Sequence, residues 1–117
     1  KELSRQEALD VILAIKRSLV PSNVQSRLNA WQTTCSPDEF GRRLTELLWR
    51  EVYPEIFERL GLPVDGGLKI LMTALETSFR DDVRLVATWQ EVQQLQRNED
   101  MARKIGKHLA ALKARQG

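Results

Sequence analysis

The chain contains one cysteine and one histidine, the two residue types that most often carry nucleophilic or metal chemistry. Cys35 directly precedes a predicted helix start, where the positive end of the helix dipole favours a thiolate. His108 lies between positive side chains, with Lys104 and Lys107 nearby, a poor setting for an imidazole that must activate a thiol. A zinc site needs more Cys or His ligands than this chain has. We therefore expect no catalytic residues, no metal site and no enzyme activity, and rank an enzyme that uses Cys35 last.

Glycine and acidic pairs near predicted helix starts raise two further possibilities for chemistry. Gly66-Gly67 precedes a helical pattern, but the sequence has neither the Gly-Lys-Ser/Thr ending of a phosphate loop nor a GxGxxG motif. Asp81-Asp82 is typical of a helix start, where acidic side chains interact favourably with the dipole. Turn and helix-capping chemistry explain both pairs, and we expect no cofactor.

Aromatic and arginine side chains suggest a protein-binding surface in the middle of the chain. Trp49 and Tyr53 are four residues apart and should share one face of a helix, with Arg50 beside them. Trp, Tyr and Arg are over-represented in the residues that dominate protein interfaces. Packing in the core is the alternative for the aromatic pair, because the surrounding helix is apolar over more than one stripe.

The C-terminal stretch, from about residue 100 to residue 115, has the pattern of a basic amphipathic helix. Its apolar side is formed by Met101, Ile105, Leu109 and Leu112. Its basic residues are Arg103, Lys104, Lys107, Lys113 and Arg115. Such a helix suits contact with a phosphate backbone or with an acidic partner, and the alternative is a terminal helix held by its apolar stripe. It lacks an aromatic residue on the apolar side, which argues against insertion into a membrane surface.

Helix start and stop signals divide the chain into five to seven short helices. Ser4 with Glu7 forms a capping box, and Ser36 followed by Pro37 marks the clearest later start. Ser22, Asp65 and a Ser78/Asp81 pair are further capping candidates. Pro21 should end the first helix, Pro54 should break or kink the third, and Gly61 should end that segment in a left-handed conformation.

Helical periodicity of apolar residues continues through the chain, and strand patterns are nearly absent. The segment from Leu68 to Phe79 is strongly apolar and carries few charges, so we expect it to be the most buried helix. The sequence predicts a single all-α domain over residues 1–117, a compact bundle or array without a sheet.

Length and composition exclude several classes of protein. The chain has 117 residues, 42% hydrophobic and 29% charged, which is ordinary for a globular domain and unlike a disordered chain. The longest apolar run is five residues, far below the ~20 of a membrane span. Net charge is only +2, but residues 37–65 carry seven acidic and four basic groups, whereas residues 99–117 carry two and five. One unpaired cysteine favours the cytoplasm, although a chain that begins at Lys1 leaves its native start open.

Two functional hypotheses follow. The first is a non-catalytic protein-interaction module, acting as a regulator, an assembly factor or a small subunit of a complex, with Trp49, Arg50 and Tyr53 as contacts. The alternative is a nucleic-acid-binding accessory protein that neutralises phosphates with its basic C-terminal helix. A second copy of the chain is a further candidate partner, because a small chain rich in apolar helices can leave one apolar stripe uncovered.

Overall fold

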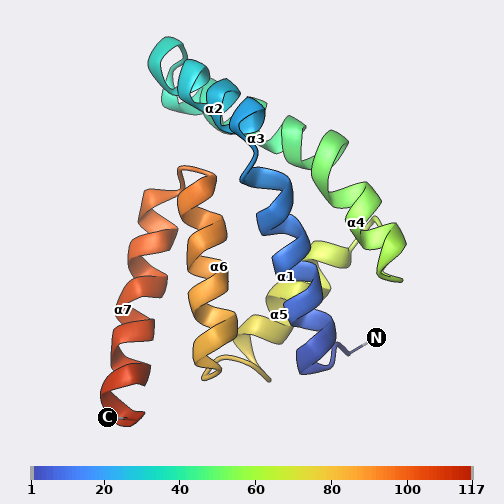
Figure 1. The fold of residues 1–117 in the computed structure, drawn as a ribbon, viewed down its shortest axis with the longest axis vertical. Coiled ribbons are helices and arrows are strands. Elements are labelled where there is room, and N and C mark those ends of the chain that lie inside the picture. Colours follow the sequence, from blue (N-terminus) through green and yellow to red (C-terminus); the bar gives the residue numbers. More distant parts are fainter. Residues whose placement is uncertain (1, 117) are drawn as a thin grey trace.

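A computed structural model describes residues 2–116 as an assembly of helices (Figure 1). The elements in this part of the chain are α1 (Arg5–Leu19), α2 (Ser22–Thr34), α3 (Pro37–Leu47), a π-helical turn η1 (Leu48–Val52), α4 (Tyr53–Arg59), α5 (Gly67–Glu76), α6 (Val83–Leu95) and α7 (Glu99–Gln116). No strand occurs between residues 2 and 116, so the predicted all-α fold is confirmed. None of the helices described here combines the length and the apolar character needed to cross a bilayer.

Local capping signals account for the best-predicted helix boundaries. The Ser4 side chain accepts a hydrogen bond from the Glu7 backbone N–H, and the Glu7 carboxylate accepts one from the Ser4 N–H. Ser36 caps α3 in the same way, accepting from the Glu39 N–H at 3.2 Å, with Pro37 as the first helical residue. α1 ends at Leu19, two residues before Pro21, as predicted.

Three other capping predictions were wrong. Pro21, not Ser22, is the residue that precedes α2, and its side chain makes no capping bond. Gly66, at a φ of 94°, precedes α5 in place of Asp65. The break before α6 is present, but Asp82 caps this helix by accepting from the Leu85 N–H at 3.1 Å. The residue before the helix is displaced by one position for α2 and α5 and by four positions, from Ser78 to Asp82, for α6, because the local backbone conformation selects the boundary.

Pro54 produces the predicted irregularity in the form of a π-helical turn. Proline has no N–H, so the carbonyl four residues earlier, on Arg50, loses its helical donor. The turn widens just before this point, and the Tyr53 N–H bonds to the carbonyl of Leu48, five residues back. α3, η1 and α4 therefore run on as one irregular helix that ends at Arg59. Gly61 follows the C-cap Leu60 and has the predicted left-handed φ of 77°.

The core is built around α1, which lies between α6 and α4 with α5 behind it (Figure 1). Seven of the fifteen α1 residues are buried. α5 has four buried residues out of ten, so the expectation that it would be the most buried helix was wrong. α1 occupies the central position and contacts both α6 and α4, whereas α5 lies behind it. Part of the apolar surface of α5, including Ile70 and Met72, stays half-exposed.

α6 and α7 form an antiparallel hairpin in which α7 packs chiefly on α6 (Figure 1). Leu109 and Leu112 of α7 meet Val86 of α6 in a small apolar cluster separate from the main core. The connecting turn has the Schellman pattern, with the Asn98 N–H bonded to the Gln93 carbonyl at 2.9 Å and Arg97 in a left-handed conformation at φ 65°.

α2 and α3 lie together at one end of the molecule and are held to the rest partly by polar contacts (Figure 1). Only Leu28 of α2 is buried. The Arg97 guanidinium, from the α6–α7 turn, donates to Gln25 Oε1 and to Asn29 Oδ1, both at 2.6 Å. Gln25 in turn donates to the Leu19 carbonyl at 2.6 Å. These bonds connect α2 with the end of α1 and with the α6–α7 turn.

Candidate functional site

The aromatic residues expected to share a surface belong to a series of ring contacts that extends from the surface into the core. Trp49 is 38% exposed, and its ring meets Tyr53 edge-on at 4.9 Å between centroids. Tyr53 is only 4% exposed and stacks on Phe57 at 5.3 Å. Arg50 is exposed and forms an ion pair with Glu46 at 2.8 Å. Of these three predicted contact residues, Trp49 and Arg50 are exposed to solvent, and Tyr53 is buried and packs against Trp49.

The Tyr53 hydroxyl is enclosed by the fold. Burial raises the pKa of this phenol above its usual value, and a hydrogen bond with Gln96 lowers it by less. Gln96 is itself buried, and its Nε2 has no hydrogen-bond partner. This polar pair connects α4 with the end of α6 inside an otherwise apolar region.

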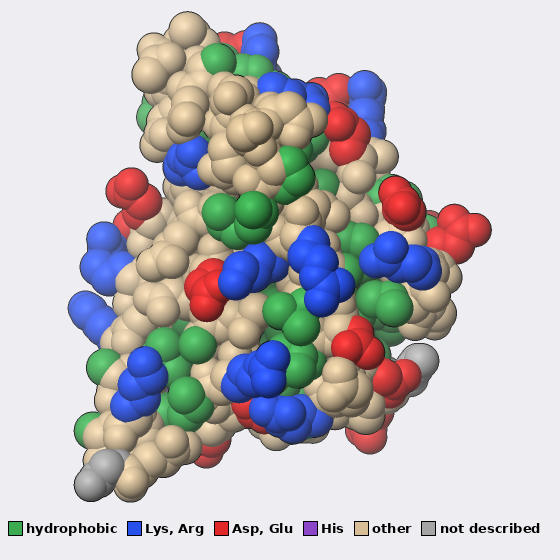
Figure 2. All heavy atoms as spheres, in the orientation of Figure 1, with side chains coloured by type: hydrophobic (Ala, Val, Ile, Leu, Met, Phe, Trp, Pro, Cys, Tyr) green, Lys and Arg blue, Asp and Glu red, His purple; other side chains and the backbone are tan. Residues whose placement is uncertain are grey.

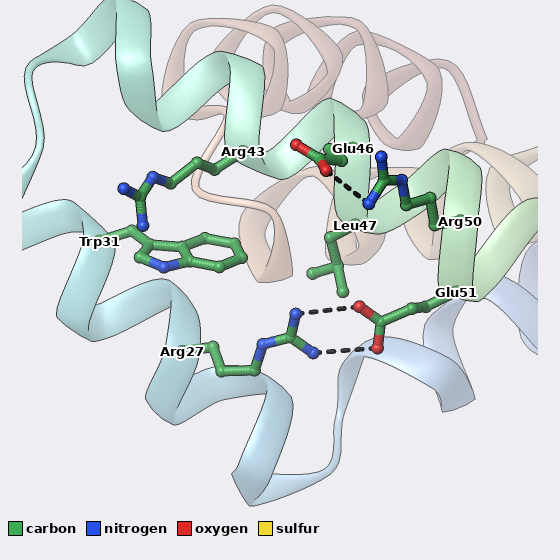
Figure 3. Close-up of a pocket in the computed structure, with 7 residues that line it drawn as sticks. All are labelled: Arg27, Trp31, Arg43, Glu46, Leu47, Arg50 and Glu51. Atoms are coloured by element: carbon green, nitrogen blue, oxygen red, sulfur yellow. Dashed lines mark hydrogen bonds and ion pairs between the residues drawn. The ribbon is translucent and has the colours of Figure 1, made fainter.

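A second aromatic residue, Trp31, lines a cleft of about 370 Å³ between α2 and the α3–η1 segment (Figure 3). The guanidinium carbons of Arg27 and Arg43 lie 5.4 and 5.9 Å from the Trp31 ring centroid. Arg27 also forms a bidentate pair with Glu51, at 3.0 and 2.9 Å, which lowers the pKa of that carboxyl group.

The charges in this cleft neutralise one another. Arg43 pairs with Glu39 at 3.0 Å, and Arg50 pairs with Glu46. Each of the three arginines that line the cleft therefore has an acidic partner. An incoming anion would have to compete with a carboxylate at every one of them, so this cleft is a weak candidate for anion binding.

The basic side chains of α7 extend from the helix on several sides. Arg103 forms an ion pair with Asp100 at 2.6 Å. Lys104 and Lys113 are nine residues apart, about two and a half turns, and therefore lie on opposite sides of the helix. Basic groups are visible along the α7 edge in Figure 2, whereas basic and acidic groups mix over α1 and α4. Four α7 cations have no acidic partner among residues 2–116: Lys104, Lys107, Lys113 and Arg115.

An apolar groove, not predicted from the sequence, lies where α5, α6 and α7 meet. Its volume is about 230 Å³. The apolar side chains that line it are Met72, Leu75, Val86, Trp89, Met101 and Ile105. They include both methionines of the chain. Met101 is 37% exposed, one of the four most exposed large apolar residues in the described chain.

Polar groups surround this groove at its rim. Arg80, from the α5–α6 turn, and Lys104, from α7, supply positive charge, and Glu76 is the one acidic residue in the lining. His108 Nε2 lies 2.7 Å from the Arg80 carbonyl oxygen, close enough for the ring N–H to donate. This contact ties α7 to the α5–α6 turn and fixes the groove width at that end.

The remaining reactive residues are separated. Cys35 is a half-buried free thiol at the end of α2, in a cleft shared with Arg97 and Asp100. His108 lines the apolar groove instead. Between residues 2 and 116, no three His, Cys, Asp or Glu side chains come together in a group that could hold a metal ion.

In comparisons with known proteins, no family model, no curated protein and no solved structure matches the chain.

Proposed function

We propose that this protein is a non-catalytic interaction module that binds a helical segment of a partner protein in the α5–α6–α7 groove. The observation that carries the proposal is the groove itself, an apolar floor open to solvent and lined by both methionines. A regulator, an assembly factor or a small subunit of a complex would use such a surface, and the unpaired cysteine favours a cytoplasmic setting.

The chemistry of the floor favours a protein segment. Methionine is flexible and polarisable, and it is common on surfaces that adapt to the side chains of a partner. Trp89 contributes an aromatic wall to the groove although only 7% of it is exposed. A groove between helices accepts the apolar face of another helix, whereas an added strand would need a sheet edge, and no strand occurs in residues 2–116.

A displayed peptide library tests the proposal. The library consists of amphipathic helices with a randomised apolar seam and with Glu, Gln or Lys at the other positions. We expect enrichment on the wild-type protein and loss of binding with Met101→Glu, which places a charge on the groove floor. The matched control is Val64→Glu, because Val64 is similarly exposed, at 39%, and lies outside the groove. No enrichment, or binders that Met101→Glu leaves intact, would overturn the proposal.

The second candidate function is nucleic-acid binding, and the unpaired cations of α7 favour it. Phosphate contacts made by such cations weaken steeply as salt increases. Fluorescence anisotropy with labelled random DNA and RNA at two salt concentrations tests this candidate. Because non-specific binding depends on the overall positive charge of α7, charge reversal at Lys104 or at Lys113 should reduce it to a similar extent. The absence of binding at low salt would remove this candidate.

A further inference from the structure

We propose that the segment bound in the α5–α6–α7 groove is an acidic amphipathic helix. This inference rests on the proposed function and adds the charge of the partner. It follows from the distribution of unpaired charge around the groove, because the apolar floor alone would accept a helix of either positive or negative net charge.

The rim of the groove carries positive charge that is unpaired within the described part of the chain. Neither Arg80 nor Lys104 has an acidic partner among residues 2–116. Some cations elsewhere are already neutralised within the fold: Arg5 is paired with Asp82, Arg27 with Glu51 and Arg43 with Glu39. Only Glu76 supplies negative charge to the groove lining. A partner carboxylate at this rim would therefore meet a free cation without displacing an existing pair.

The sequence of α7 extends this bias beyond the groove. After Asp100 the helix contains no acidic residue, while it carries five lysines and arginines. Opposite charge across an interface accelerates association and disfavours partners of the wrong sign. A basic helix approaching the groove would pass along this positive surface, and repulsion would act against it.

Helix geometry defines the partner further. Lys104 and His108 are four residues apart on α7, about one turn, and both line the groove. A helix lying on the floor would present apolar residues at intervals of three and four, as grooves of this kind require. Glutamate or aspartate residues flanking that seam one turn apart would then reach Lys104 and Arg80.

Two synthetic peptides provide the test. Both carry the same leucine seam, and the flanking positions are all Glu in one and all Lys in the other. Their affinities are measured by fluorescence anisotropy for the wild-type protein, Lys104→Glu and Lys113→Glu. The two variants make the same change of charge on the same helix, but only Lys104 lines the groove. Circular dichroism confirms that both variants stay folded.

The acidic peptide is expected to bind the wild-type protein at least about tenfold more tightly than the basic one. This ratio of affinities should decrease at high salt, because salt screens the charges. Lys104→Glu should weaken acidic-peptide binding about three- to tenfold, and Lys113→Glu less than about twofold. Equal affinity for the two peptides, with both lost in Met101→Glu, would overturn the acidic partner and leave the docking groove intact. Equal losses in the two lysine variants would also overturn it. If no peptide binds and the library yields none, the proposed function fails as well.

Discussion

Tyr53 illustrates how single side chains connect the surface of this protein with its core. Its ring lies between exposed Trp49 and fully buried Phe57, and its hydroxyl forms a hydrogen bond with Gln96. A phenolate at this position would lose solvation without gaining a cation. The folded protein therefore holds Tyr53 in its neutral form.

The raised pKa of Tyr53 predicts a loss of stability in alkali. Below the ordinary phenol pKa of about 10, the folded and unfolded states are both protonated, and the contribution is fully present. As pH rises towards the folded pKa, the unfolded state loses its proton first and becomes favoured. Because Tyr53 is the one tyrosine in the chain, tyrosinate absorbance follows it alone. We expect its midpoint above 10 in the folded protein.

The control for this prediction is Tyr53→Phe. This variant should show a shallower decline of unfolding free energy above about pH 10, since the titrating group is gone. A tyrosinate midpoint at the ordinary value in the folded state would contradict the enclosed position of the hydroxyl.

At the scale of the helices, the distance to a neighbouring segment determines whether a glycine can be replaced by alanine without a clash. A Cβ added to Gly67, the first residue of α5, would lie 2.7 Å from Cδ2 of buried Phe57. A Cβ added to Gly41, inside α3, would meet no atom within 4 Å. The same substitution should thus have opposite effects at the two positions.

Gly41→Ala should stabilise the protein by about 0.5–1 kcal/mol, because alanine restricts the unfolded chain and favours the helix. Gly67→Ala should destabilise it by about 1–3 kcal/mol, because the Phe57 ring must move within a packed core. Urea unfolding of both variants measures the difference. An equal effect of the two substitutions would show that α5 does not lie against Phe57 as described.

The same scale shows where sequence patterns suffice and where they do not. The Ser4 and Ser36 caps were predicted correctly because each depends on residues within one turn. Ser22 and Asp65 were predicted as caps on residue type alone, and the neighbouring backbone selected Pro21 and Gly66 instead. Pro54 indicated an irregular helix, but the widened turn that accommodates it depends on packing around η1.

The groove escaped prediction for a physical reason. Met72 lies in the strongly apolar segment from Leu68 to Phe79, and Met101 lies on the apolar side of the C-terminal helix, so the sequence alone places each on an apolar face. Whether such a stripe is covered depends on the tertiary arrangement. α1 takes the central position with α5 behind it, and α7 packs chiefly on α6, so residues of α5, α6 and α7 line one opening. Periodicity identifies an apolar face, but not the neighbour that covers it.

On the scale of the whole molecule, stability should be distributed unevenly. α1 has seven buried residues and belongs to the main core, whereas the longer α7 has three and shares a small separate cluster with Val86. Local opening of a helix costs less free energy when fewer apolar contacts must be broken. α7 can therefore open while α1 stays in place.

Hydrogen exchange followed by mass spectrometry tests this distribution. Backbone amides in the middle of α7 should exchange faster than those in the middle of α1, by at least about tenfold if opening α7 costs about 1.4 kcal/mol less. Binding of a peptide in the groove should slow exchange in α7 more than in α1. Equal protection of the two helices in the free protein would show that the molecule opens only as one unit.

The position of the two methionines allows the groove to be followed by its own spectroscopic signals. Met72 and Met101 both line the groove, and the chain contains no other methionine. A spectrum of the protein labelled at methionine methyl carbons thus contains two signals, each from a residue that lines the candidate binding surface. The exposed thioether of Met101 also makes the surface chemically addressable, since its oxidation to the sulfoxide would turn an apolar contact into a polar one.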